Sequence, residues 1–220
     1  MSKKIKGRRI IITAGPTREY LDPVRFITNE SSGKMGYAIA EVLYEHGANV
    51  TLISGPVSIQ SAIPADNIIQ VVTANEMLEA CKNYFDKVDA AVFSAAVADY
   101  RPINTSECKI KKAEQVSVIE LIKNPDIAFE FGKIKTDKQI SIGFALETND
   151  VFINAENKLK TKSFDAIVIN SPKKDEGFGY DTNRISILRN DGTINHYPLK
   201  LKSQVAIDIV NELIELSAWD

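Results

Sequence analysis

The sequence predicts an α/β fold: a three-layer, Rossmann-like, mostly parallel sheet that ends in a C-terminal antiparallel hairpin. Three observations predict it. Runs rich in Ile and Val are nearly continuous, which is typical of strands covered on both faces. Amphipathic stretches separate these runs and indicate helices. Near the C-terminus, Asn190-Asp191-Gly192 lies between two strand-like runs, which indicates a hairpin with Asp-Gly turn chemistry.

The expected elements follow in chain order. Strands are predicted at 8–15, 49–55, 68–73, 90–98, 139–147 and 166–170, and the hairpin at 184–200. Residues 117–122 are expected to be ordered. Helices are predicted at 34–47, at 74–85, from about Pro125, at 150–163 and at 203–219. Asn124 suits the N-cap of the third helix, with Pro125 at its first position. Residues 101–115 are polar and contain a proline, so we expect a mobile lid loop there.

Composition sets limits on the class of protein. The chain has 220 residues, is 44% hydrophobic and 25% charged, and carries a formal net charge of −2. These values fit one soluble domain over residues 1–220, without repeats or a linker, and disfavour a nucleic-acid-binding protein. No apolar run approaches a signal peptide or a membrane span. Cys81 and Cys108 show no disulfide or metal-binding spacing, so we expect a reduced, cytoplasmic setting.

The strand order predicts where a ligand binds. In open parallel sheets, ligands bind outside the carboxyl ends of the strands. That rule brings Gly15, the segment 94–99, Phe144 and Asn170 to one rim. Asp99 could accept hydrogen bonds from a ligand's hydroxyl or amino groups, or it could cap a local turn.

A second glycine cluster, "SSGKMG", opens the helix after a long polar insert. The glycines fit neither the dinucleotide pattern nor the P-loop pattern. Even so, a helix N-terminus offers unpaired N–H groups and partial positive charge, and Ser31, Ser32 and Gly33 could receive a phosphate or carboxylate there. The alternative is an ordinary helix start with glycines for packing.

The insert itself carries Arg18, Asp22, Arg25 and Asn29. Two arginines on the ligand rim could clamp phosphate or carboxylate groups. They could equally form a surface ion network with Asp22. Asn29 could donate to a developing anion or serve as a turn residue.

Two further motifs allow either interpretation. The lysines of "CKIKK" (108–112) could bring charge onto a polyphosphate if the loop closes as a lid, or could simply be solvated. The helix start at "KNPDI" (123–127) could contact a phosphate or base through its N–H groups.

Other chemistries are less well supported by the sequence. His46 and His196 lie outside these motifs, and no nucleophile–base pair or metal-ligand cluster is visible. The strand that ends at Ile53 is followed by Ser54-Gly55 rather than by the acidic residue of an NAD site, which disfavours an NAD(P)-dependent reductase.

Taken in order, "ITAGPTRE", "DPVRFITNESSGKMG", "AAVADY", "KIKK", "KNPDI", "GFALET" and "FGYDTNR" resemble phosphopantothenate–cysteine ligase, also called phosphopantothenoylcysteine synthetase. These motifs cover the chain from Ile11 to Arg184. The resemblance implies a ligase of coenzyme A biosynthesis that joins 4′-phosphopantothenate to L-cysteine through an acyl nucleotide, with release of pyrophosphate.

The resemblance also implies partners and cofactors. The compact motifs look bacterial, which implies CTP and Mg²⁺, an acyl-cytidylate and a cytoplasmic homodimer. With Met1 just before the first strand, the chain looks like a stand-alone ligase whose product passes to a separate phosphopantothenoylcysteine decarboxylase. The alternatives are an ATP-using ligase of the same family and a non-catalytic nucleotide-binding regulatory module.

By motif position, the resemblance assigns roles to individual residues. Asn29 resembles the asparagine at the acyl-nucleotide intermediate, Arg25 an arginine that contacts phosphopantothenate across a dimer interface, and Lys109 the lid lysine used in activation. Phe144 resembles the residue that lines the base pocket. The rest of the implied nucleotide site is Ser94, Ala95, Ala96, Asp99, Lys109, Pro125, Asp126, Ile127, Ala128, Lys158 and Lys162.

Overall fold

A computed structural model describes residues 2–111, 118–146, 150–170, 180–217 and 219. Its centre is an eight-stranded sheet in the order β12-β11-β10-β9-β6-β1-β4-β5. The strands are β1 (Arg9–Ala14), β4 (Asn49–Ser54), β5 (Ile68–Gln70), β6 (Ala90–Phe93), β9 (Ile140–Leu146), β10 (Ala166–Asn170), β11 (Thr182–Arg189) and β12 (Ile194–Leu201). All neighbours from β5 to β10 are parallel, whereas β10–β11 and β11–β12 are antiparallel. The predicted fold class is confirmed.

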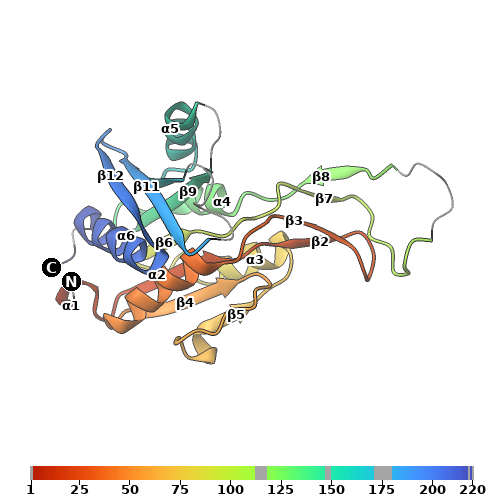
Figure 1. The fold of residues 1–220 in the computed structure, drawn as a ribbon, viewed down its shortest axis with the longest axis horizontal. Coiled ribbons are helices and arrows are strands. Elements are labelled where there is room, and N and C mark those ends of the chain that lie inside the picture. The colour runs from red at the N-terminus through yellow and green to blue at the C-terminus, as the bar shows by residue number, and fades with distance from the viewer. Residues whose placement is uncertain (1, 112–117, 147–149, 171–179, 218, 220) are drawn as a thin grey trace.

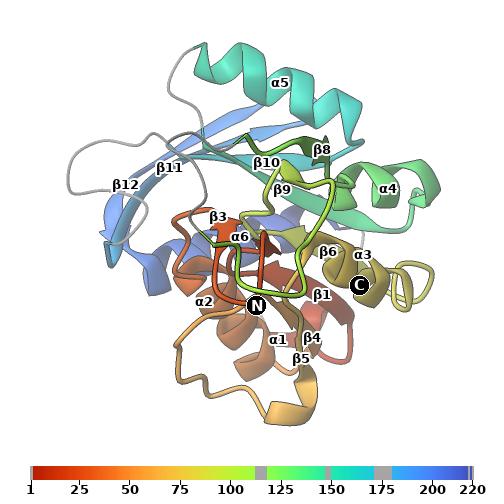
Figure 2. The same cartoon turned by 90° about the vertical axis from the view of Figure 1, so that its right-hand side faces the viewer.

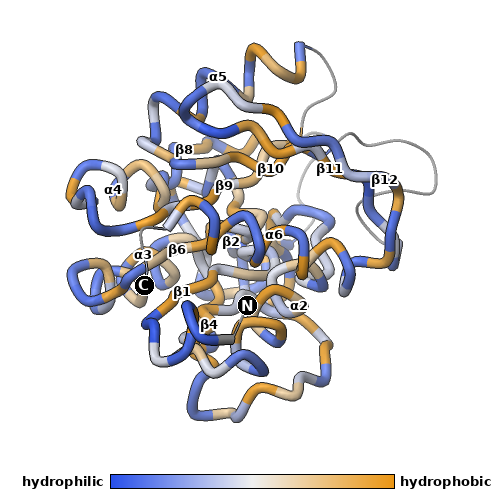
Figure 3. The backbone as a smooth tube through the Cα atoms, turned by 90° about the vertical axis from the view of Figure 1, so that its left-hand side faces the viewer, coloured by the Kyte–Doolittle hydropathy of each residue, from blue (hydrophilic) through white to orange (hydrophobic). Residues whose placement is uncertain are grey.

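Helices cover both faces of the sheet (Figures 1 and 2). Those that pack on one face are α2 (Lys34–Glu45) and α6 (Lys202–Leu216), and those on the other are α3 (Ala74–Lys82), α4 (Ile127–Ile134) and α5 (Val151–Thr161). The short helices are α1 (Ser2–Ile5) and the 3₁₀ turn η1 (Ala65–Asn67). Each face therefore has its own apolar core, and Figure 3 shows hydrophobic stretches running through the middle of the molecule.

Two antiparallel hairpins project from the body and form an arm (Figure 1). One pairs β2 (Arg18–Tyr20) with β3 (Phe26–Thr28), and the other pairs β7 (Tyr100–Pro102) with β8 (Leu121–Lys123). Neither hairpin was predicted, because three-residue strands give too short a sequence pattern to recognise. The part of the expected lid from residue 103 to 111 has no regular secondary structure, and its end at 112–115 lies outside the described residues.

Several expected boundaries are wrong. The strand expected at 90–98 ends at Phe93 as β6, and the helix expected at 74–85 ends at Lys82 as α3. Two further errors concern helix starts. Strand β5 ends at Gln70 rather than residue 73, because Thr73 caps α3 in a capping box with Glu76. Asn124 is not the cap of α4. Asp126 caps it instead, with its carboxylate accepting from the N–H of Phe129 at 3.1 Å. Among the described residues, no helix has the length and apolar character to span a bilayer.

Candidate functional site

A cavity of about 870 Å³ opens at the carboxyl ends of the central strands. The chain leaves β1 towards β4 on one side and returns to β6 on the other, so β1 and β6 flank the switch point of the sheet. Thr13 at the end of β1, Phe93 at the end of β6 and Phe144 in β9 line the cavity. The predicted position of the ligand rim thus coincides with a large cavity, called here the main pocket.

The N-terminus of α2 forms one wall of the main pocket. Ser31, Ser32 and Gly33 line it, as predicted for the glycine cluster. Gly33 is the N-cap, with φ of 76°, and no side chain caps the helix among the described residues. A β-carbon at Gly33 would lie 2.9 Å from Val57 Cγ1 and 3.3 Å from the Cα of Gly15. Gly15 therefore lies behind this wall and does not itself line the pocket.

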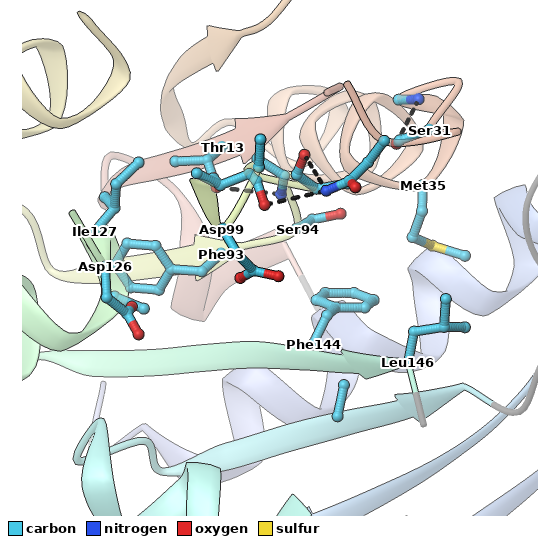
Figure 4. Close-up of a pocket in the computed structure, with 18 of the residues that line it drawn as sticks. Thr13, Ser31, Met35, Phe93, Ser94, Asp99, Asp126, Ile127, Phe144 and Leu146 are labelled. Carbon is cyan, nitrogen blue, oxygen red and sulfur yellow. Dashed lines mark hydrogen bonds between the residues drawn. The ribbon is translucent and has the colours of Figure 1, made fainter. Parts of the chain in front are cut away.

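The segment after β6 forms a second wall of the pocket, next to the first. Main-chain N–H groups of this segment are held by the β1 side: Ala95 donates to Thr13 Oγ1 at 3.3 Å and Ala96 to the Gly15 carbonyl at 2.9 Å. Ser94, Ala95, Ala96 and Asp99 all line the pocket, and Asp99 is exposed. Figure 4 shows the ring of Phe144 across the pocket from this segment.

Asn29 lies between the main pocket and a smaller cavity of about 460 Å³. Its Nδ2 donates to the carbonyls of Ala96 at 3.2 Å and Val97 at 3.1 Å. Both amide hydrogens are thus engaged by the main chain, and donation to an anion would require the side chain to turn. Arg18 lines the smaller cavity, where its guanidinium carbon lies 4.6 Å from the ring centre of Phe26.

Helices α4 and α5 form the third side. Pro125, Asp126, Ile127, Ala128, Lys158 and Lys162 all line the pocket. The helix α5 ends at Thr161 with Lys162 as its C-cap, and the N–H of Lys162 donates to the Lys158 carbonyl at 3.0 Å. The two lysines are therefore one turn apart, as expected. Lys162 pairs with Asp126, Nζ to Oδ2 at 2.9 Å.

Two predicted catalytic residues, Arg25 and Lys109, lie on the arm and do not line either cavity. Arg25 binds Asp22 through Nε and Nη2 and donates from Nη2 to the Ile110 carbonyl at 3.0 Å. These hydrogen bonds from Arg25 hold the pKa of the buried Asp22 carboxyl well below its usual range. Lys109 is exposed. The arm borders the main pocket through Tyr100 of β7 and Lys123 of β8, whereas Arg25 and Lys109 lie away from it in this single chain.

Three charged or polar residues that line one corner of the pocket were not among the predicted site residues. Lys34 and Lys202 are the first residues of α2 and α6, and Asn183 lies in β11. Burial lowers the pKa of Lys202, the charge of Lys34 lowers it further, and Asp181 opposes both. Lys34 belongs to the cluster "SSGKMG" and Asn183 to the motif "FGYDTNR", whereas Lys202 lies in none of the motifs.

The lining carries more positive than negative charge. Five lysines and three carboxylates line the main pocket: Lys34, Lys123, Lys158, Lys162 and Lys202, with Glu30, Asp99 and Asp126. The whole chain, by contrast, has a formal net charge of −2. Among the described residues, no group of three or more His, Cys, Asp or Glu side chains could hold a metal ion. The pocket therefore suits an anionic ligand.

Comparisons with known proteins agree with this geometry. A family model described as "DNA/pantothenate metabolism flavoprotein C-terminal domain" matches residues 5–216. The "Coenzyme A biosynthesis bifunctional protein CoaBC" of Bacillus subtilis (strain 168) is 43% identical over 217 residues, which is 98% of this chain and 53% of that protein. A "Cysteine/Cysteine sulfinic acid decarboxylase" from an unknown prokaryotic organism is 47% identical over 215 residues, 97% of this chain and 60% of that protein.

A solved structure has the same fold. The "C-terminal Domain of Coenzyme A biosynthesis bifunctional protein CoaBC" aligns with a TM-score of 0.80 and 41% identity, covering 97% of this chain and 98% of that chain. The chain spans only about half to three fifths of the length of the two curated relatives.

Proposed function

The chain belongs to the family of DNA/pantothenate metabolism flavoprotein C-terminal domains, and from this premise we propose that it is a phosphopantothenate–cysteine ligase of coenzyme A biosynthesis. The observation that carries the proposal is the lysine-rich main pocket at the switch point of the sheet, with the open N-terminus of α2 in its wall. A nucleoside triphosphate and a phosphorylated acid are both anions, and such a wall attracts both.

The first step of the proposed reaction activates a carboxylate. A carboxylate oxygen of 4′-phosphopantothenate attacks the α-phosphorus of CTP. The bond from that phosphorus to the bridging oxygen breaks, and pyrophosphate leaves with the electron pair. Lysines at the pocket, among them Lys158 and Lys162, would stabilise the charge that develops on the phosphates. Mg²⁺, bound to the triphosphate, would supply further charge shielding.

The second step forms the amide. The amine of L-cysteine attacks the acyl carbon of the acyl-cytidylate, the carbon–oxygen bond to phosphate breaks, and CMP leaves while the amine gives up a proton. Asn29 lies beside the Ala96 and Val97 carbonyls at the border of both cavities. We assign Asn29 to the handling of the acyl-cytidylate, with its side chain turning from those carbonyls.

The arm suggests how Arg25 and Lys109 reach the chemistry. Several large apolar side chains on the arm are exposed in the single chain: Val24, Phe26, Tyr100, Ile103, Ile110, Ile119, Leu121 and Ile122. Exposed apolar surface of this extent favours burial against a partner. We therefore assign the arm to a homodimer, in which Arg25 and Lys109 serve the partner's pocket or close over their own. We expect the dimer to work in the cytoplasm.

A direct assay tests the proposal. The protein is mixed with Mg²⁺, CTP, phosphopantothenate and cysteine, and pyrophosphate is followed together with the mass of the product. Omission of cysteine should leave the acyl-cytidylate, and ATP in place of CTP should give a slower reaction. Absence of pyrophosphate with both nucleotides, despite measured CTP binding, would instead favour the regulatory module.

The relative named as a decarboxylase provides a second candidate. It matches this chain over 60% of its own length, so its named activity can depend on the region outside the match. Cysteine or cysteine sulfinic acid supplied alone should give no CO₂. Release of CO₂ from either compound would contradict the ligase assignment.

A further inference from the structure

The starts of α2 and α6 meet at one corner of the main pocket. Asp181 joins them: its carboxylate binds Lys34 Nζ at 2.5 Å, and its main-chain carbonyl accepts from the N–H of Lys202 at 2.8 Å. Lys34 and Lys202 are the first residues of their helices, and no side chain caps either helix among the described residues. Two helix N-termini and two ammonium groups therefore converge, with one carboxylate between them.

The same corner contains two carboxamides whose oxygen atoms are buried. Asn183 is 1% exposed, and both Asn183 and Asn170 line the pocket. The Oδ1 atom of each is buried and has no hydrogen-bond partner among the described residues. Asn170 pairs in register with Ile185, two residues beyond Asn183, so both side chains come from the same end of adjacent strands. A buried acceptor without a donor is costly, which points to a ligand that supplies one.

The two sets of groups suit different parts of one ligand. Ammonium groups and helix N-termini bind phosphate oxygens. Carboxamide oxygens instead accept from metal-bound water or ligate a hard cation such as Mg²⁺, which binds proteins through few oxygens and keeps several waters. A magnesium-bound diphosphate has both parts, and the first step of the proposed reaction releases one.

We propose that this corner, defined by Lys34, Lys202, Asn170 and Asn183, binds the magnesium–pyrophosphate part of the nucleoside triphosphate and then the pyrophosphate that leaves. The inference rests on the proposed function. Lys202 and Lys34 bind the phosphate oxygens with the open ends of α6 and α2. Asn183 and Asn170 face the metal ion or its water shell. Lys202 is buried to 8% exposure, so its ammonium is screened less by solvent than those of surface lysines.

The test is calorimetric titration of the full chain with pyrophosphate, with and without Mg²⁺. Lys202→Gln should weaken pyrophosphate binding about tenfold or more under both conditions, because one charge-assisted hydrogen bond is lost. Asn183→Leu should leave metal-free binding near that of the parent and remove the gain that Mg²⁺ gives. Lys200→Gln is the matched control: it removes the same charge two residues away, where Lys200 pairs with Asp208 at 2.7 Å. It should bind pyrophosphate like the parent.

Each outcome of the titrations either supports or overturns the inference. If Lys202→Gln binds like the parent, or if Asn183→Leu keeps the full magnesium effect, the inference is overturned. Should Asn183→Leu not fold, Asn183→Asp replaces it: a carboxylate should preserve the magnesium effect and weaken metal-free binding. Pyrophosphate binding is measured without turnover, so the two proposals can fail separately. If the parent forms product but the variants bind pyrophosphate as the parent does, only the assignment of the corner is overturned. If the parent binds pyrophosphate in a magnesium-dependent way but forms no product in the ligase assay, only the ligase proposal is overturned.

Discussion

Lys162 Nζ lies 2.9 Å from Asp126 Oδ2, which joins the end of α5 to the cap of α4 beside the main pocket. The family resemblance implied that both residues belong to the nucleotide site, and the structure pairs them with each other. A phosphate that binds Lys162 must therefore compete with a carboxylate that also holds a helix in place.

This pair gives the first prediction. Asp126→Asn should tighten CTP binding about two- to fivefold, because a partly exposed ion pair of modest strength no longer competes for Lys162. Asparagine still caps α4, so stability should hardly change. Asp126→Ala loses the cap as well and should cost about 1 kcal/mol of unfolding free energy. Titration calorimetry and urea unfolding measure the two effects. Weaker CTP binding in Asp126→Asn would mean that the carboxylate itself serves the ligand.

The second prediction separates the roles of Lys109 and Asn29. Lys109→Gln should slow pyrophosphate release about a hundredfold or more, since it removes charge stabilisation from the activation step. Lys111→Gln, two residues along the same exposed segment, is the matched control and should be near the parent rate. Rapid-quench measurement of the acyl-cytidylate gives the readout. Equal loss in both variants would reassign the effect to the general charge of the arm.

Asn29→Asp should act later. A carboxylate would repel the phosphate of the acyl-cytidylate, so the intermediate should leave the enzyme or hydrolyse faster, while CTP binding changes little. The yield of acyl-cytidylate per pyrophosphate released is the quantity to follow. A variant that retains the parent yield would show that Asn29 has no part in holding the intermediate.

The third prediction concerns acid stability of the arm. Hydrogen bonds from Arg25 lower the pKa of Asp22, burial opposes this, and N–H groups of Val24 and Ile110 add to the lowering. A lowered folded-state pKa stabilises the fold above the ordinary carboxyl value of about 4, and that contribution is lost as the pH falls below it. Between pH 7 and pH 3, the Tm of Asp22→Asn should therefore fall by less than the Tm of the parent. As a control, Asp137→Asn changes an exposed carboxylate, and its Tm should depend on pH as that of the parent does.

The fourth prediction concerns the packing of α2 on β1. A β-carbon at Gly36 would lie 2.6 Å from the β-carbon of Ala14 and 3.2 Å from its Cα. Gly36→Ala should therefore cost about 1–3 kcal/mol by overpacking. The double variant Ala14→Gly with Gly36→Ala removes the nearer contact and should recover part of that loss in urea unfolding. Full additivity of the two changes would exclude the contact as the cause.

The sequence predicted those parts of the fold that have long or distinctive local patterns. Continuous apolar runs gave the parallel strands, and Asp191-Gly192 gave the hairpin between β11 and β12. The arm was missed because each of its strands has three residues, and Pro102 pairs with Leu121 from well beyond it in the chain. Pairings of that kind depend on tertiary contacts rather than on local periodicity.

The site was predicted to a similar extent, for the same reason. The segment at Ser94 and the start of α2 have glycine or small residues that mark close approach, and both line the pocket. No sequence pattern marked Lys202 as a site residue, because a lysine at a helix start is expected to be solvated and only the tertiary fold buries it. The pocket positions of Asn170 and Asn183 likewise depend on the pairing of β10 with β11.

The two ends of the chain lie together at the end of the molecule away from the arm (Figure 1). There, Ile5 and Trp219 belong to the same apolar core, and the Arg8 guanidinium lies 5.1 Å from the Trp219 ring centre. The backbone thus nearly closes into a loop. Affinity tags, surface tethers or fused domains at either terminus would extend from the same end of the molecule, leaving the arm free, and a short added peptide could join the termini for circular permutation.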